Sequence, residues 1–199
     1  GMPSPVASMT FPCLAKAVDH CIKEAGSKGK DPVIFLSGGP GSGKSASMKW
    51  LCKAFTERVA ARGTGEHAPY PLHIDLEFTA EDAEHLEDHV RDDLDRQLVD
   101  TRDPTPAVWL LDGLDLLKDS GKRIVSMIHA RMARNRETMS APESFIIATR
   151  PDPMVDSLLD QFPLSFRLSL CALERERAME WVRKHYPGGV SARLERFTQ

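Results

Sequence analysis

The sequence has no long apolar run, no paired-cysteine motif and no excess of basic residues. None of its hydrophobic segments approaches the roughly 20 residues that a helix needs to cross a bilayer, so we expect no membrane span. Its four cysteines, Cys13, Cys21, Cys52 and Cys171, form no C-x-x-C pair. This excludes the common zinc and redox motifs and favours reduced, buried thiols in the cytoplasm. The net charge of −3 lacks the basic signature of a nucleic-acid-binding protein.

The first ten residues carry neither a signal-peptide pattern nor any helical or strand periodicity. Gly1 stands before Met2, which is typical of the remnant of a cleaved tag. We therefore interpret residues 1–10 as a disordered N-terminal segment. Residues 11–199 have the length and the mixed composition, 41% hydrophobic and 28% charged, of a single globular domain.

Predicted strands and helices alternate along this domain. Apolar runs and β-type patterns predict strands at 33–37, 70–76, 107–112, 145–149 and 166–170. Helical spacing of apolar residues predicts helices at 11–25, 44–62, 81–100, 121–140, 154–159 and 173–186. This order is typical of a three-layer α/β fold, in which helices cover both faces of a parallel sheet of about five strands.

The segment between the first predicted strand and the next helix matches G-x-x-x-x-G-K-[ST], the pattern of a phosphate-binding P-loop or Walker A motif. It reads Gly38, Gly39, Pro40, Gly41, Ser42, Gly43, Lys44 and Ser45, followed by Ala46. Glycines let the backbone turn so that its N–H groups converge on an anion, and the helix N-terminus adds positive partial charge. We expect Lys44 to reach the β- and γ-phosphates of a nucleotide and the Ser45 hydroxyl to bind Mg²⁺.

Two further polar residues stand at the ends of buried predicted strands. Asp112 ends the strand at 107–112, as a Walker B carboxylate does when it holds Mg²⁺ opposite the P-loop hydroxyl. Arg150 follows the strand at 145–149 and is held extended by Pro151. Because ligands bind at the carboxyl ends of parallel strands, we expect the P-loop, Asp112 and Arg150 to meet at one edge of the sheet.

These motifs together resemble a known family. The run Leu110-Leu111-Asp112-Gly113-Leu114-Asp115 is similar to the extended Walker B of the NACHT group, within the STAND class of signal-transducing P-loop NTPases. Arg150-Pro151 is similar to sensor 1 of that group, and the resemblance covers about residues 33–186. It implies that Asp112 belongs to the Mg²⁺ site, that Asp115 is a second acid near the attacking water, and that Arg150 senses the γ-phosphate.

Two features depart from the family pattern. Leu116 stands where the family usually has Glu, so the water-orienting role is left to Asp115 or lost. The chain also stops near the end of the NTPase core, so we expect an excised core of a larger switch or a small relative. The implied function is an ATP- and Mg²⁺-dependent signalling switch with weak ATPase activity, an ADP-bound alternative state, and protein partners or self-association.

Two other functions remain open. A small-molecule or nucleotide kinase also has a P-loop, and Arg131, Arg134 and Arg136 could form its lid, although the helical pattern there favours an exposed helix end. A nucleotide-binding scaffold without turnover would explain Leu116. No Asn-Lys-x-Asp element occurs, which disfavours guanine as the base.

Weaker candidates lie elsewhere in the chain. Asp75 and Glu77, near the end of the strand at 70–76, are fallback acids. His85 and His89 have metal-ligand spacing on the acidic helix at 81–100, but histidines in such a helix are usually exposed. The acidic residues of that helix favour a solvated face over a patch for a basic partner.

Overall fold

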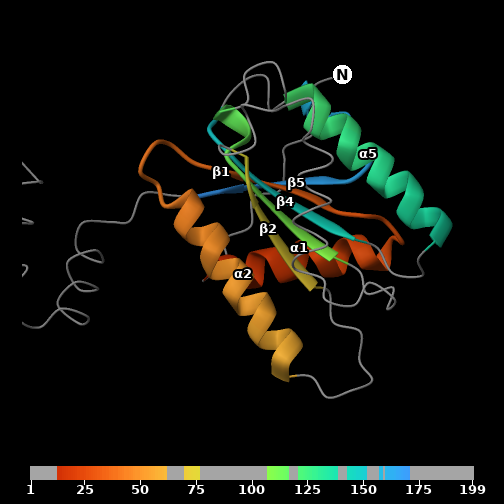
Figure 1. Ribbon diagram of the computed structural model, residues 1–199, viewed down its shortest axis with the longest axis horizontal. Helices are drawn as coiled ribbons and strands as arrows, with labels where there is room; N and C mark the ends of the chain where they lie inside the picture. The colour runs from red at the N-terminus through yellow and green to blue at the C-terminus, as the bar shows by residue number, and fades with distance from the viewer. Residues whose placement is uncertain are drawn as a thin grey trace, which may run out of the picture.

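The computed structural model describes residues 13–61, 70–76, 107–116, 121–138, 143–151, 157–158 and 160–170 (Figure 1). Its elements are α1 (Leu14–Ser27), β1 (Val33–Ser37), α2 (Lys44–Ala61), β2 (Tyr70–Asp75), β3 (Ala107–Asp112), the 3₁₀ turn η2 (Leu114–Leu116), α5 (Gly121–Thr138), β4 (Ser144–Thr149) and β5 (Ser165–Ser169). The predicted strands at 33–37 and 107–112 are confirmed with unchanged bounds. The other described strands and helices begin or end within a few residues of their predicted positions.

Several predictions fall outside the described residues. These are the disordered segment at 1–10, the helices at 81–100 and 173–186, and most of the helix at 154–159. Glu77, His85, His89 and Cys171 belong to the same group, so their predicted roles stay predictions.

All five strands run parallel, in the order β2-β3-β4-β1-β5. This confirms the predicted α/β class with its five-stranded parallel sheet. β4 lies between β1 and β3, although it follows both of them in the chain. The residues that leave β1, β3 and β4 therefore emerge side by side at the carboxyl edge of the sheet, with the end of β4 in the middle.

Helices cover both faces of the sheet, as predicted (Figure 1). One face packs against α1 and α2 through a core that includes Val18, Ile34, Leu36, Met48, Leu51, Phe55, Val108, Leu110 and Ile146. The other face packs against α5 through Phe35, Trp109, Leu111, Ile124, Ile128, Phe145 and Ile147, among others. β1, β3 and β4 are buried along their whole length, which is why their sequences show no polar alternation.

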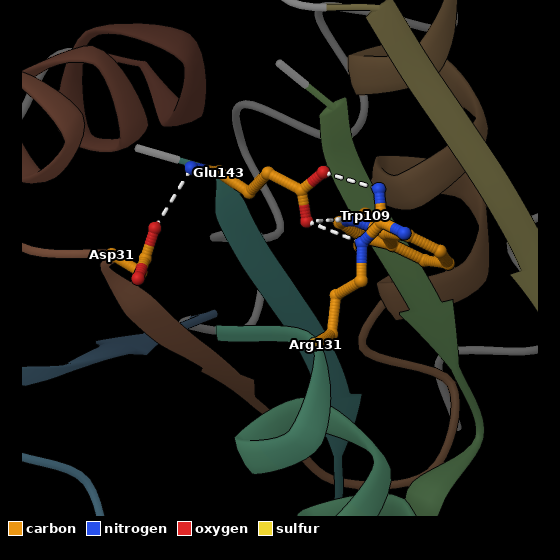
Figure 2. Close-up of polar contacts among 4 residues, drawn as sticks. All are labelled: Asp31, Trp109, Arg131 and Glu143. Carbon is orange, nitrogen blue, oxygen red and sulfur yellow. Dashed lines mark hydrogen bonds and ion pairs between the residues drawn. The ribbon is translucent and has the colours of Figure 1, made fainter. Parts of the chain in front are cut away.

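A buried carboxylate fixes α5 at the amino edge of the sheet, where the strands begin (Figure 2). Glu143 is only 1% exposed. It accepts hydrogen bonds from Trp109 Nε1 at 3.1 Å and from Nε and Nη2 of Arg131 at 2.9 and 2.7 Å. Its backbone N–H donates to Oδ1 of Asp31 at 2.9 Å. Both carboxylate oxygens of Glu143 thus have partners (Figure 2), as buried polar groups generally require.

The prediction of an exposed helix end is wrong for Arg131. Its guanidinium is half-buried and lies 5.4 Å from the centre of the Trp109 ring. Hydrogen bonding to Glu143 raises the pKa of Arg131 above its ordinary value. Arg136 is exposed, with Nε 4.0 Å from Oδ2 of Asp31. Both arginines therefore lie at the edge of the sheet opposite the P-loop.

We expect Glu143→Ala to destabilise the protein strongly. The change leaves Trp109 Nε1 without its acceptor and removes the counter-ion of Arg131, so the free energy of unfolding should fall by about 3 kcal/mol. Urea denaturation would measure the loss. The matched control is Glu57→Ala, since Glu57 pairs with Lys53 at 3.8 Å on the exposed surface of α2 and should contribute less than about 0.5 kcal/mol. Equal losses in the two variants would contradict the anchoring role of Glu143.

Candidate functional site

The segment between β1 and α2 forms a tight loop at the carboxyl edge of the sheet. Gly41 and Gly43 have φ angles of 70° and 87°, a conformation that glycine adopts without strain. The N–H of Ser42 donates to the carbonyl of Gly39 at 3.2 Å. α2 begins at Lys44, so the free N–H groups of its first turn and its positive dipole end adjoin the loop. The strand–loop–helix context predicted for the P-loop motif is thus confirmed.

Gly38 is buried at the point where the loop leaves the sheet. Its N–H donates to the carbonyl of Thr149 at 3.3 Å, and the N–H of Leu170 donates to the carbonyl of Ser37 at 2.8 Å. A Cβ atom on Gly38 would lie 2.4 Å from Oγ of Ser42 and 3.3 Å from Cβ of Leu170. A Cβ on Gly39 would meet nothing within 4 Å. The closed shape of the loop therefore depends on the missing side chain at Gly38.

Two polar side chains of the loop are suited to an anion. The Lys44 ammonium donates to the carbonyls of Gly38 and Gly39 at 2.7 and 3.1 Å, which keeps the positive charge against the loop. Oγ of Ser42 is buried and has no hydrogen-bond partner among the described residues. A buried hydroxyl without a partner costs about 1–3 kcal/mol, which a ligand oxygen can relieve. The residues of the loop thus fit a bound phosphate.

Ser45 lies next to Lys44 in the first turn of α2 and is exposed, as is Ala46. Its hydroxyl is therefore accessible to a ligand that approaches the loop. Pro40 and Gly41 are exposed at the tip of the loop. The tip of the loop and the first turn of α2 are thus exposed at the carboxyl edge of the sheet.

Asp112 ends β3 on the face of the sheet that α2 covers. Val108 and Leu110 pack in the core beneath α2, and alternate residues of a strand share one face. Asp112 therefore lies on the same side of the sheet as Lys44 and Ser45, and it is only 5% exposed.

A carboxylate and a hydroxyl are oxygen ligands of the kind that Mg²⁺ prefers, and this ion commonly uses few protein ligands beside water and phosphate. Ser45 and Asp112 therefore fit a magnesium ion in their chemistry. No group of three or more His, Cys, Asp or Glu side chains that could hold a metal ion occurs in the described part of the chain, which a phosphate-bound Mg²⁺ does not require. Asp75, the fallback acid, is the register partner of Asp112 across β2 and β3.

Arg150 and Asp115 contact each other, although the family resemblance implies separate roles for them. Nε of Arg150 lies 2.8 Å from Oδ2 of Asp115, with the two side chains 52% and 15% exposed. Asp115 belongs to η2, a turn that follows Gly113 (φ 92°) and in which the N–H of Leu116 donates to the carbonyl of Gly113 at 3.0 Å. Asp115 is therefore inside a 3₁₀ turn and ion-paired. The sequence carried no signal for this contact, because the pairing depends on β4 lying beside β3.

The three described cysteines differ in exposure. Cys13, Cys21 and Cys52 are free thiols, and the prediction of burial is wrong for Cys13, which is exposed. Burial raises the pKa of the Cys21 thiol to about 11, which keeps it protonated and unreactive at neutral pH.

None of the described helices is long and apolar enough to span a membrane.

Comparison with known proteins found no family model that matches this chain, and no significant match among curated proteins. The resemblance to the NACHT group therefore rests on the motifs and on their positions in the fold.

We expect Gly38→Ala to disrupt the loop and Gly39→Ala to be tolerated. The Cβ added at position 38 overlaps Ser42, whereas the Cβ at position 39 enters open space. Overpacking of this kind costs about 1–3 kcal/mol, so Gly38→Ala should lower the free energy of unfolding by about that amount, and Gly39→Ala by less than about 0.5 kcal/mol. Urea denaturation measures both losses. If Gly39→Ala had the larger effect, the described loop geometry would be wrong.

Proposed function

We propose that this chain is an ATP-binding domain of the NACHT type, within the STAND class, and that it acts as a nucleotide-dependent switch. The observation that carries this proposal is the convergence of the P-loop, Asp112 and the Arg150–Asp115 pair at the carboxyl edge of one parallel sheet. Open parallel sheets bind ligands at this edge. The orphaned Ser42 hydroxyl and the Lys44 ammonium add polar groups suited to phosphate.

The arrangement of the loop and the strand ends supports a specific role for each residue. The N–H groups of residues 38–45 and the first turn of α2 would hold the β-phosphate, and Lys44 would exchange its carbonyl contacts for phosphate oxygens. Ser45 and Asp112 would hold Mg²⁺, which neutralises charge on the β- and γ-phosphates when it is bound. Arg150 would distinguish ATP from ADP, because only ATP carries charge at the γ-position.

We also propose that turnover is slow. Leu116, which stands in place of the family's Glu, is 41% exposed. Asp115, the remaining acid of this turn, is already engaged by Arg150. These two observations also favour the second candidate, a nucleotide-binding scaffold without turnover. We further propose that the domain is cytoplasmic and that its output passes to protein partners or to further copies, as the resemblance implies.

The structure does not support the lid considered for the kinase alternative. Arg131, Arg134 and Arg136 were the candidates for that lid. Arg131 and Arg136 contact residues at the amino edge of the sheet, away from the P-loop, and the side chain of Arg134 lies outside the described set.

We expect Lys44→Ala to abolish nucleotide binding, with an affinity loss of about 100-fold or more, because it removes a charge-assisted contact to phosphate. The control is Lys49→Ala, which removes an exposed lysine from α2. Isothermal titration with Mg-ATP provides the measurement. Parent-like binding by Lys44→Ala would refute the P-loop assignment.

The nucleotide that co-purifies with the protein, identified after acid release, complements this test. ATP or ADP would support the switch, and a phosphorylated metabolite beside it would support a kinase.

We expect Leu116→Glu to raise the rate of ATP hydrolysis. The site is exposed enough to accept a glutamate, and a positioned general base typically contributes a factor of about 10² to 10⁴. An increase in kcat of at least roughly tenfold, without a change in ATP affinity, is the expected result. Leu116→Gln is the matched control, since it has a similar shape without the basic oxygen pair. Equal rates for the two variants would show that Leu116 does not limit turnover.

A further inference from the structure

We propose that Asp115 sets the preference of the site for ATP over ADP by competing with the γ-phosphate for Arg150. The inference rests on the proposed function. It gives Asp115 a role different from the one that the family resemblance implies, an acid beside the attacking water. The observation behind it is the 2.8 Å ion pair between Nε of Arg150 and Oδ2 of Asp115.

Arg150 lies between the position proposed for the γ-phosphate and the carboxylate of Asp115. Thr149, the residue before it, accepts a hydrogen bond from the N–H of Gly38, the first residue of the P-loop. The backbone of Arg150 is therefore one residue from the loop. Its guanidinium nevertheless contacts η2, on the side of β3. Because β4 lies between β1 and β3, Arg150 stands between the loop and Asp115.

The side chains of Arg150 and Asp115 differ in how well water can solvate them if the ion pair breaks. The Arg150 side chain is 52% exposed, so water can accompany it when it moves. The Asp115 side chain is 15% exposed and depends more on its partner, because a largely buried carboxylate is costly without a counter-ion. An anion that draws the guanidinium of Arg150 toward the γ-position must therefore overcome its attraction to Asp115.

ADP carries no phosphate at the γ-position and leaves the pair between Arg150 and Asp115 intact. Asp115 consequently lowers the affinity for ATP and leaves the affinity for ADP unchanged. In this way the aspartate narrows the difference between the affinities for ATP and ADP, and so sets the ATP-to-ADP ratio at which ATP displaces ADP.

The test compares the affinities of the parent, Asp115→Asn, Arg150→Ala and the double variant, for a non-hydrolysable ATP analogue and for ADP, by titration calorimetry with Mg²⁺. Asp115→Asn should bind the analogue about fivefold more tightly, which corresponds to the contribution of a half-exposed ion pair. Its affinity for ADP should not change. Arg150→Ala should weaken binding of the analogue alone. In the Arg150→Ala background, Asp115→Asn should have no effect, because its action passes through the guanidinium.

Two controls separate this role from a general structural one. Asp115→Glu keeps the charge and should restore parent-like discrimination between the two nucleotides. Glu57→Gln removes one negative charge about 20 Å along α2 from Lys44 and should change neither affinity. Thermal unfolding of each variant confirms that the fold is retained.

The outcomes are distinct. Unchanged or weaker binding of the ATP analogue by Asp115→Asn, or an equal effect in the Arg150→Ala background, would overturn the competition while leaving the proposed function intact. A parent protein that binds neither nucleotide would overturn the proposed function and this inference together.

Discussion

The backbone pairing of β4 with β1 on one side and β3 on the other is the constraint on which the rest of the site depends. β4 pairs with β1 from Val33↔Phe145 to Ser37↔Thr149 and with β3 from Val108↔Ser144 to Asp112↔Ala148. These registers bring the three strands to an end at nearly the same level. The P-loop, Arg150 and Asp112 consequently leave the sheet together, and the hydrogen bond from Gly38 to Thr149 ties the loop to β4.

The two edges of the sheet differ in how their polar groups are satisfied. At the amino edge, Glu143 and Asp31 are buried and fully engaged by neighbours, which suits an anchoring role. At the carboxyl edge, the Ser42 hydroxyl has no partner among the described residues and Arg150 is half-exposed. Unsatisfied polar groups are tolerated mainly where a ligand completes them. Nε2 of His73 on β2 is buried without a described partner too, and the structure gives no functional account of it.

The sequence was sufficient for features that depend on local spacing or on complete burial. β1 and β3 were predicted with their bounds because both of their faces are buried, and the P-loop because its pattern is contiguous. Strand order was not predictable in the same way, because it depends on pairing between segments distant in the chain.

The side-chain contacts that depend on strand order were therefore not predictable from the sequence either. The contact between Asp115 and Arg150 requires η2 to lie beside the end of β4. The cluster of Glu143, Arg131 and Trp109 requires α5 to return to the start of β4. The helical pattern alone therefore predicts an exposed Arg131, although Glu143 engages it through two nitrogens.

The contact at Asp115 also bears on turnover in an ATP site of this form. A guanidinium that donates to one oxygen of a carboxylate occupies part of its acceptor capacity, while the second oxygen can still accept a hydrogen bond from water. In the structure, Nε of Arg150 contacts Oδ2 of Asp115. If the proposed γ-phosphate attracted Arg150, Oδ2 of Asp115 would also become available to a water molecule. The exposed Leu116 beside Asp115 supplies no second acid at this turn. With one acid at this turn and that acid ion-paired, the arrangement supports the proposed switch with slow turnover more than a rapid hydrolase.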